Sequence, residues 1–514
     1  MEKNIRKIVF VLLLITTALL LRFGLEALFS FVSTRHNLTQ VVGFLYRTLF
    51  LILVIIVWLS VTLRSESPTQ KLPWLLLLAF EPLVGLILFL TFGRGFKKSK
   101  RYKNRPLIHS DKYITKETRA SEGDIDLDTD DSVLKRIFHS AHKISYHQPF
   151  TNTTKATIYK NGETFFPELI KTLKNANTFI LMEFYIIKDD TRGKEILELL
   201  MQKADSGVIV KLIGDAFGLS RLSRKMKKRL KQSAVDFIIN DPIYFPLFNT
   251  RINYRNHRKI VVIDGKIGFT GGMNLADEYD NSIAYDYYFR DTQVKLEGEA
   301  VKSLTAIFFK DYYYNTNTFI TDAIYYPSYR VFSQGITQVL QSGPDSNEAH
   351  IRNVYLKMIM NAETSIRIMT PYMAIDQEML TALIVAKQSG VNVEIIIPGK
   401  PDKRLVYNVT KFYASVLLNH GINVYRYTKG FCHAKILIVD DKIASVGSYN
   451  LDNRSAVIDF EITALLTDQA VTDVVDHFIL DKQDSEQLNQ ATWNKRFILT
   501  RLFEGLLSIF TPIL

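Results

Sequence analysis

His433-Ala-Lys435-Ile-Leu-Ile-Val-Asp440 is followed, after six residues, by Gly447-Ser448-Tyr-Asn450. The same frame stands earlier in the chain, as His257-Arg-Lys259-Ile-Val-Val-Ile-Asp264 and then Gly271-Gly272-Met-Asn274. The two copies lie 176 positions apart, align without a gap and agree at eight of eighteen positions. Because the repeat distance is that of a domain and not of a short repeat, the chain is predicted to contain a duplicated domain.

The residues after each lysine are Ile, Val and Leu, which predict a buried β-strand. Alternate side chains of a strand share one face, so His257 and Lys259 are expected to point the same way, and so are His433 and Lys435. Each copy therefore offers one imidazole and one ammonium group side by side. Two such half-sites on two similar domains predict a single site at the domain interface, near a pseudo-twofold axis.

Each predicted strand ends at an aspartate, Asp264 or Asp440, which suits a turn. Each aspartate lies five positions after its lysine, which along a strand is a span of roughly 16 Å. This distance favours a role in the turn and the strand register over direct contact with a substrate. After the return strand, a glycine-rich corner lets the backbone approach a ligand. The short polar or glycine positions there, which we take as substrate-binding candidates, are Gly272, Asn274, Ser448 and Asn450.

Helical and strand patterns alternate on both sides of the frames. In the first half we expect helices at 165–175 and 192–206 and strands at 178–187 and 208–213. The second half repeats short pieces of this pattern, such as Asn361-Ala-Glu-Thr364 for Asn175-Ala-Asn-Thr178. The predicted fold is therefore α/β, with two tandem α/β/α domains at 151–330 and 331–485 that form a pseudo-twofold pair.

Residues 1–93 are predicted to form a membrane anchor with two or three transmembrane helices. The apolar runs are 8–21, which can extend to residue 31, then 49–63 and 72–92. Glu81 lies within the third run, before Pro82. A carboxylate inside a membrane is by default a functional residue, yet Glu81 can equally lie at a helix kink. The sequence assigns it no role.

Seven basic residues and no acidic one occupy 94–105, which places the rest of the chain in the cytoplasm by the positive-inside rule. We take 94–150 as a basic juxtamembrane segment and linker. Its acidic part, 122–131, alternates aspartates as a calcium loop does but lacks the glycine and the closing glutamate, so a solvated linker is favoured. If the anchor has three spans, the N-terminus lies outside the cell. If it has two, the N-terminus lies inside.

The net charge is +12 and the isoelectric point is about 9.3, which favours an anionic partner. A single cysteine, Cys432, excludes an internal disulfide and is compatible with a reducing compartment. No cluster of Cys, His and Asp has the spacing of metal ligands, so we predict no metal and no cofactor. The basic run 221–231 is either a solvated helix face or a surface that faces anionic headgroups. It lacks the interleaved aromatic residues of single-stranded nucleic-acid channels, and no nucleic-acid partner is predicted.

The last segment, 486–514, has apolar residues at helical spacing from Phe497 onward. Three basic residues, Lys495, Arg496 and Arg501, stand near its start. This pattern suits an amphipathic helix that lies in a membrane interface. A helix packed on the protein itself would show the same pattern.

The duplicated frame resembles the two His-x-Lys motifs of the phospholipase D superfamily. Within it, the chain is most similar to bacterial cardiolipin synthases, and the likeness covers nearly the whole length. Besides the two frames, the residues that carry it are Leu72-Pro-Trp-Leu, Pro82-Leu-Val-Gly85, Phe92-Gly-Arg94, Glu183-Phe-Tyr-Ile, Asp277-Glu-Tyr279, Arg290-Asp-Thr292, Thr370-Pro-Tyr372 and Leu451-Asp-Asn-Arg-Ser455. Two positions depart from the family pattern: Gln293 replaces an expected histidine, and Ile375 an expected proline.

The resemblance implies transphosphatidylation, in which two phosphatidylglycerol molecules give cardiolipin and glycerol. It implies a catalytic set of His257, Lys259, Asp264, His433, Lys435 and Asp440. It also points to the first histidine as the nucleophile, which would form a phosphohistidine. The residue chemistry agrees, because two histidines with pKa values near 6.5 can divide the roles of nucleophile and acid.

The two lysines would neutralise the nonbridging oxygens, aided by the asparagines and Ser448. A carboxylate behind each histidine would fix its tautomer. The candidates are Glu461 for His433 and Asp291 for His257.

Other readings keep the fold and change the acceptor, to water in a phospholipase D or to serine in a phosphatidylserine synthase. A membrane-anchored nuclease would need an open basic groove, and a non-catalytic scaffold would not need two His-Lys pairs. The expected location is the bacterial cell membrane, with the catalytic domains in the cytoplasm. The expected partner is an anionic phospholipid, and no oligomeric state follows from the sequence.

Overall fold

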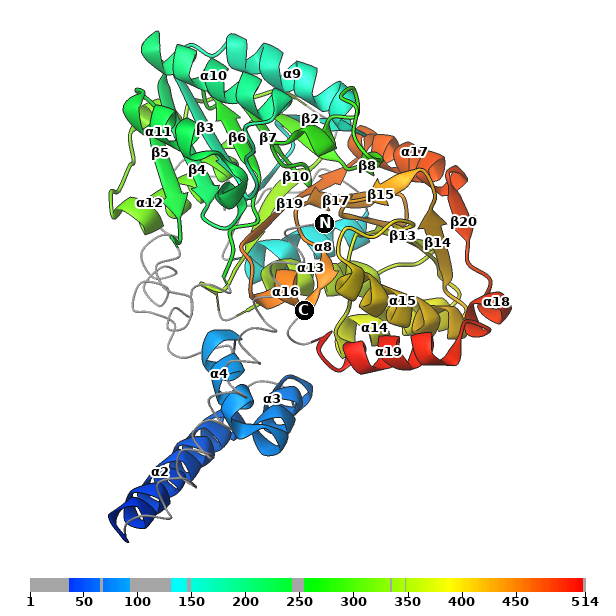
Figure 1. The fold of residues 1–514 in the computed structure, drawn as a ribbon. Coiled ribbons are helices and arrows are strands. Elements are labelled where there is room, and N and C mark those ends of the chain that lie inside the picture. The colour runs from blue at the N-terminus through cyan, green and yellow to red at the C-terminus, as the bar shows by residue number, and fades with distance from the viewer. Residues whose placement is uncertain are drawn as a thin grey trace. The chain divides into compact units, whose positions relative to one another are not determined.

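The computed structural model describes residues 37–64, 68–92, 131–145, 149–242, 254–332, 335–346 and 348–511. These residues fall into two compact units: a helical unit, which comprises the described residues up to 92, and a larger α/β unit (Figure 1). Three expectations concern other residues and lie outside the described part: the apolar run 8–31, the basic segment 94–105 and the acidic alternation up to residue 130.

The helical unit begins with the 26-residue helix α2 (Asn37–Thr62). Within it, Leu45–Thr62 is long and apolar enough to cross a membrane, and it is the one such helix among the described residues. Most of its large apolar side chains are exposed. The predicted span at 49–63 therefore lies on a helix of the expected kind.

The predicted span at 72–92 is not one helix but two, α3 (Pro68–Phe80) and α4 (Pro82–Phe92). Glu81 separates them, because the ring of Pro82 interrupts a continuous helix at that point. With 13 and 11 residues, they are roughly 20 and 16 Å long, and each is shorter than a bilayer core of about 30 Å. The two helices pack on each other, with the rings of Trp74 and Phe89 edge to face at 5.4 Å.

The α/β unit contains two mixed sheets. The first has the order β2-β9-β7-β6-β3-β4-β5. Its strands are β2 (Thr154–Tyr159), β3 (Phe179–Phe184), β4 (Ile209–Asp215), β5 (Asp236–Asn240), β6 (Ile260–Ile263), β7 (Ile267–Gly271) and β9 (Gln293–Gly298). The predicted strands of the first half are thereby confirmed, as are its two predicted helices, α9 (Gly162–Lys174) and α10 (Thr191–Asp205).

The second sheet has the order β1-β10-β19-β17-β16-β11-β13-β14-β20. Its strands are β1 (Phe150–Thr151), β10 (Thr337–Ser342), β11 (Ser365–Met369), β13 (Asn392–Pro398), β14 (Asn423–Tyr427), β16 (Ile436–Val439), β17 (Ile443–Gly447), β19 (Glu461–Thr467) and β20 (Ser485–Gln487). Seven strands, β10 to β14 in sheet order, match the first sheet strand by strand, with the same parallel and antiparallel neighbours. The fold is thus the predicted pair of similar α/β halves.

The helices cover the outer faces of both sheets (Figure 1). On the first sheet these are α9, α10 and α11 (Arg224–Gln232), which share one apolar core with it. On the second they are α13 (His350–Met360), α14 (Gln377–Gln388) and α15 (Arg404–Asn419). A third core joins the inner faces of both sheets and includes α12 (Val301–Thr316) and α17 (Gln469–Gln483). The shorter helices are α16 (Asn453–Val457), α18 (Gln490–Asn494) and α19 (Ile498–Ser508).

The end of the predicted linker belongs to the second half. Helix α8 (Ser132–Ile144) starts at Asp131, whose carboxylate accepts the backbone N–H groups of Val133 and Leu134. Its buried residues join the core that lies under α13, and β1 pairs with β10. The chain therefore contributes α8 and β1 to the second half before it forms the first half. The linker expected over 94–150 ends in these two elements, which are part of the α/β unit.

Two short parallel contacts join the halves around the site. Strand β8 (Tyr288–Arg290) of the first half pairs with β15 (Gly430–Cys432) of the second. On the other side of the pseudo-twofold axis, Asn256 forms a bridge with Phe460. The remaining short pair, β12 (Met373–Ala374) with β18 (Leu451–Asp452), lies within the second half.

Candidate active site

The two histidines lie in the segments that lead into β6 and β16. His257 and Lys259 precede β6, and His433 and Lys435 precede β16. The His433 side chain is 7% exposed and that of His257 is 12% exposed. Both lysines are buried. The structure therefore brings each predicted imidazole beside its ammonium group, in extended segments just before the strands and not within them.

The lysines contact the backbone of their own histidines. Lys259 Nζ donates to the carbonyl of His257 at 2.6 Å, and Lys435 Nζ donates to the carbonyl of His433. Burial, opposed by the nearby carboxylates, lowers the pKa of Lys259 to about 7 and that of Lys435 to about 8. Both ammonium groups are thus poised to bind an anion that restores their charge.

The carboxylates pair with the histidines in the order opposite to the one expected. Glu461 lies 3.1 and 3.2 Å from His257 Nδ1, and Asp291 Oδ2 lies 2.6 Å from His433 Nδ1. Each expected pair, Glu461 with His433 and Asp291 with His257, takes both residues from the same half of the chain. In the structure, each histidine is held by the other half.

The parallel contacts between the halves explain this exchange. Because Cys432 pairs with Arg290, the next residues, His433 and Asp291, come side by side. The bridge between Asn256 and Phe460 likewise aligns the two residues that follow them, a histidine and a glutamate. Backbone N–H groups of both histidines donate across the interface, at 2.9 Å to the carbonyl of Phe460 and at 2.7 Å to that of Arg290.

Burial shifts the ionisation of all these groups. It raises the pKa of Asp291 to about 6 and that of Glu461 to about 7. It also lowers the pKa of both histidines well below 6.5, and the adjacent lysines lower it further. Both histidines are therefore neutral at pH 7. A carboxylate that accepts a hydrogen bond from the Nδ1–H group leaves Nε2 free to act as nucleophile or base.

Gly272 and Ser448, at equivalent positions of the two frames, each lie against the carboxylate of their own half. Ser448 Oγ donates to Glu461, and the same carboxylate lies 3.1 Å from His257 Nδ1. At Gly272, a Cβ atom would lie 2.1 Å from Asp291 Oδ1. Gly272 therefore leaves room for a carboxylate, whereas Ser448 binds one.

The two predicted asparagines are bonded within the protein. Asn274 accepts the N–H of Ile186 at 3.1 Å and donates at 2.8 Å to the hydroxyl of Tyr279, whose ring lies edge to face on His433 at 5.4 Å. Asn450 donates to Ser455 at 3.3 Å. These contacts place the asparagines as supports of the site, and contact with a substrate stays a prediction for them.

Asp264 and Asp440 lie at the far ends of β6 and β16 from the lysines. Both adopt positive φ angles, +52° and +54°. Asp264 accepts the backbone N–H groups of residues 177–179, and Asp440 those of residues 363–365. Each aspartate thereby fixes the start of a neighbouring strand, β3 or β11. The turn and register role inferred from spacing agrees with this geometry, and a direct part in the reaction stays a prediction for both aspartates.

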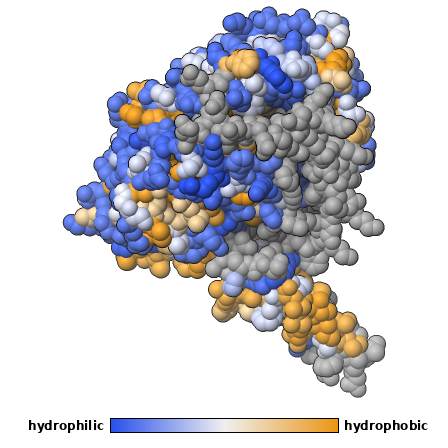
Figure 2. All heavy atoms as spheres, turned by 180° about the vertical axis from the view of Figure 1, so that it is seen from behind, coloured by the Kyte–Doolittle hydropathy of each residue, from blue (hydrophilic) through white to orange (hydrophobic). Residues whose placement is uncertain are grey.

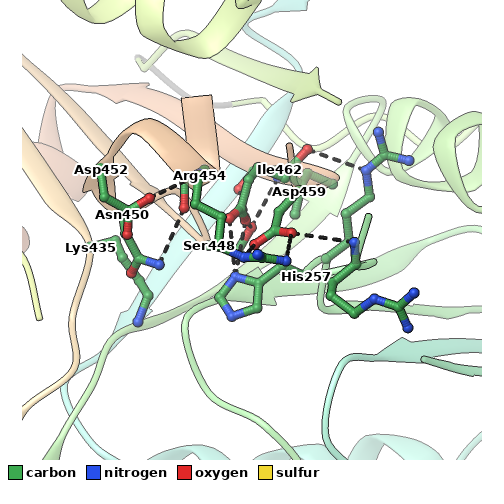
Figure 3. A network of polar contacts seen from close by, with 12 residues as sticks. His257, Lys435, Ser448, Asn450, Asp452, Arg454, Asp459 and Ile462 are labelled. Carbon is green, nitrogen blue, oxygen red and sulfur yellow. Dashed lines mark hydrogen bonds and ion pairs between the residues drawn. The ribbon is translucent and has the colours of Figure 1, made fainter. Parts of the chain in front are cut away.

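Several residues around the site stand in the quoted motifs but were given no role from the sequence. Tyr185 lies directly after β3 and packs its ring on His257 at 4.9 Å. Arg258 is fully buried, donates to Asp311 at 2.5 Å and reaches the carbonyl of Glu461 in the other half. Arg454 forms a bidentate pair with Asp459 beside them (Figure 3). Arg258 occupies the variable position of the first His-x-Lys frame, so its place in the motif was the available signal.

Within the described part of the chain, no group of three or more His, Cys, Asp or Glu side chains is arranged to hold a metal ion. The groups that face one another are two neutral imidazoles, two ammonium groups and two carboxylates. Two similar α/β halves that share one such site define a phospholipase D-like enzyme.

Comparisons with known proteins identify the family. The family model "Cardiolipin synthase, PLD-like domain" matches residues 169–295 and again 355–481, and a phospholipase D-nuclease N-terminal model matches 50–94. The cardiolipin synthase of Halalkalibacterium halodurans is 35% identical over 476 residues, which cover 91% of this chain and 94% of that protein. The probable cardiolipin synthase YwiE of Bacillus subtilis is also 35% identical, over 88% of this chain and 91% of that protein. The chain belongs to the cardiolipin synthase family and is a phosphatidyltransferase.

Among solved structures, phosphatidylserine synthase of Haemophilus influenzae has the same fold. It superposes with a TM-score of 0.54 and covers 74% of this chain and 100% of that chain, at 17% sequence identity. The likeness supports the duplicated α/β architecture.

We expect Asp264→Ala and Asp440→Ala to lower stability and leave the chemistry in place. Each change removes three backbone hydrogen bonds, which contribute about 1 kcal/mol each, so a loss of about 2–3 kcal/mol is expected. Thermal unfolding of the detergent-solubilised protein and turnover per folded molecule measure the two effects. Loss of turnover without loss of stability would show that the aspartates act in the reaction.

We expect Gly272→Ala to reduce kcat by about 100-fold, because its Cβ displaces the carboxylate that holds His433. Ser448→Ala is the matched control. It removes one hydrogen bond to Glu461 and adds no atom, so a loss of about tenfold is expected. Near-normal kcat in Gly272→Ala would contradict the role given to Asp291.

Proposed function

We propose that the protein makes cardiolipin and glycerol from two phosphatidylglycerol molecules through a phosphohistidine. The observation that carries this proposal is the pair of buried histidines, each held at Nδ1 by a carboxylate of the other half and flanked by a lysine. A double displacement needs one imidazole as nucleophile and one as acid and base. It also needs positive charge to neutralise the phosphate that both imidazoles act on. The family membership supports the product.

In the first step, Nε2 of His257 attacks the phosphorus of one phosphatidylglycerol. The bond to the glycerol oxygen breaks as that oxygen takes a proton from His433, and a P–N bond forms. In the second step, His433 removes the proton from a hydroxyl of the second lipid, which attacks phosphorus and breaks the P–N bond. The group that acts as acid in the first step thus acts as base in the second.

The site supports His257 as the nucleophile. A phosphorylated imidazole carries positive charge, which a carboxylate at Nδ1 stabilises throughout the life of the intermediate. Glu461 meets His257 Nδ1 with both oxygens and is itself held by Ser448. Burial keeps the pKa of His257 low, so the imidazole is neutral before the reaction, as a nucleophile must be.

The acid, His433, needs a proton that its lowered pKa does not supply in the free enzyme. A bound phosphodiester whose leaving oxygen faces His433 adds a negative charge there and raises the pKa of that imidazole. Lys259 and Lys435 would contact the nonbridging oxygens of that phosphate. Substrate binding would therefore protonate the acid where it is needed.

We propose that the protein lies in the bacterial cell membrane through α2 and further N-terminal helices, with the α/β unit in the cytoplasm. The exposed apolar surface of α2 supports an anchor of this kind. The test of the whole proposal is product analysis after incubation of the purified protein with labelled phosphatidylglycerol, with and without a chelator. Phosphatidic acid in place of cardiolipin would make the protein a hydrolase, and a requirement for serine a phosphatidylserine synthase.

We expect His257→Ala and His433→Ala each to abolish cardiolipin synthesis. The first change removes the nucleophile, and the second removes the acid and base. Wild-type protein quenched rapidly in denaturing detergent near neutral pH should carry a phosphatidyl group on His257, and His433→Ala should slow the release of that adduct. Mass spectrometry of the quenched protein locates it. An adduct on His433 would reverse the two roles, and the absence of any adduct under trapping conditions would favour direct displacement.

We expect kcat/KM for a soluble short-chain phosphatidylglycerol to fall as the pH rises through about 7 to 8. Burial lowers the pKa values of Lys259 and Lys435 to about 7 and 8, so the ammonium groups lose their protons and their charge over this range. Lys259→Arg keeps the charge at all these pH values and should leave only the fall near 8. If the pH profile of Lys259→Arg equals that of the wild type, the fall in kcat/KM near pH 7 is not caused by deprotonation of Lys259.

A further inference from the structure

Helix α19 presents its apolar side outward. The exposed large apolar residues on it and at its two ends are Phe497, Ile498, Leu499, Leu502, Phe503, Leu506, Ile509 and Phe510, with exposed fractions from 44% to 66%. Elsewhere in the described α/β unit, exposed large apolar residues stand singly or in pairs. Figure 2 shows apolar side chains gathered along the lower edge of that unit, where α19 lies.

The inward side of α19 is polar. Glu504 is the one buried residue within the helix, and it accepts from Arg496 at 2.8 Å and from Lys411 of α15 at 3.1 Å. Beyond the helix, Thr511 is buried and contacts Tyr413 of α15 at 3.2 Å. A surface helix of a water-soluble domain buries its apolar stripe and exposes its polar one. Helix α19 does the reverse, so its outer face requires an apolar partner.

The exposed charges beside this face are positive. Lys495 and Arg501 lie at the start of α19. Lys400, Lys403 and Arg404 lie around the start of α15, the helix whose Lys411 pairs with Glu504 of α19. Leu405 adds a further exposed apolar residue there. Basic residues around an apolar patch match the surface of an anionic bilayer.

The start of α15 is also next to the active site. Lys403 Nζ lies 4.4 Å from the centre of the Tyr372 ring, and Tyr372 packs on Phe431, whose ring centre is 5.7 Å from that of His433. The positive charge of Lys403 contributes to the lowered pKa of His257. The start of α15 is therefore connected to the reacting groups through three side-chain contacts, and α19 packs on the same helix.

We propose that α19 inserts its apolar face into the surface of an anionic bilayer and holds the active site at the headgroup level. The helix has 11 residues and is roughly 16 Å long, which is too short to cross a bilayer core of about 30 Å, so it lies in the interface. The α/β unit then has a membrane contact of its own, in addition to the anchor. This inference rests on the proposed function only in that the substrate is a membrane lipid.

The first test locates α19 in reconstituted vesicles of phosphatidylglycerol and phosphatidylcholine. The full-length protein is suited to single-site labelling, because its one native thiol, Cys432, is buried. Environment-sensitive labels on Leu502→Cys and Leu506→Cys should be quenched by lipids that carry a nitroxide on the upper acyl chain. A label on Lys174→Cys is the control, since this exposed residue lies at the end of α9, beside the segment that Asp264 holds and away from the histidines.

The quenching result decides between occupants of the face. Quenching at residues 502 and 506 but not at 174 supports insertion. Protection without quenching, together with cross-links between labelled chains, would assign the face to a second copy of the protein. Protection that is lost when residues 8–31 are made polar would assign it to that segment. Each of the last two results overturns the proposal. None of the three depends on the reaction, so a failure of the proposed cardiolipin synthesis is detected separately by product analysis.

The second test measures turnover. The double variant Leu502→Ser, Leu506→Ser should raise the apparent KM for vesicle substrate by about tenfold and leave turnover of a monomeric short-chain substrate unchanged. Ile479→Ser, Leu480→Ser on α17 is the matched control, because it also removes two exposed apolar side chains from the second half. An equal effect of the two double variants on vesicle substrate would overturn the proposal, and so would an equal effect of the α19 variant on both substrates.

Discussion

The backbone contact between the two halves is the constraint on which the site depends. His433 donates its backbone N–H to Arg290, and His257 donates to Phe460, so each histidine is registered against the residue before the other half's carboxylate. Buried arginines repeat this exchange. Arg258 donates to the carbonyl of Glu461 at 3.2 Å, and Arg290 pairs with Asp481 of α17 at 2.7 Å. Neither half can therefore complete a histidine-carboxylate pair alone, and the interface must form before the enzyme can act.

The charges collected at this interface oppose folding in the absence of substrate. Two lysines, two carboxylates and two histidines are buried together, and burial displaces the pKa of each from its ordinary value. Such groups make weak contributions to stability because desolvation offsets their attraction. A phosphodiester between the two lysines places its negative charge beside both ammonium groups, so a bound ligand adds an attraction that the free site lacks.

Local patterns in the sequence predicted what depends on neighbours along the chain. The apolar runs after Lys259 and Lys435 gave β6 and β16, and the spacing of Asp264 and Asp440 indicated turn residues. Helix α8 was missed, since 94–150 was taken as a linker, although Asp131 is an N-cap and Leu134, Ile137, Phe138 and Ala141 follow at helical spacing. The pairing of the carboxylates was not readable, since it depends on parallel contacts between segments 142 and 204 residues apart. A kink at Glu81 was one of the alternatives left open by the sequence, and the structure has a break between two helices there, because Pro82 lacks a backbone N–H for a continuous helix.

The halves share their topology but differ where the chemistry requires different roles. Asp291 is one carbon shorter than Glu461, and it faces Gly272, where any side chain would collide with it. Glu461 is longer and faces Ser448, which donates to it. Each carboxylate is thus matched to the residue opposite it, so a change of Gly272 or Ser448 alone would disturb a fitted pair. Each carboxylate also accepts a second hydrogen bond, Glu461 from the Ser448 hydroxyl and Asp291 from the backbone N–H of Thr292 at 2.8 Å. A side chain is the donor in one half and the backbone in the other, so a substitution can remove the donor to Glu461 but not the donor to Asp291.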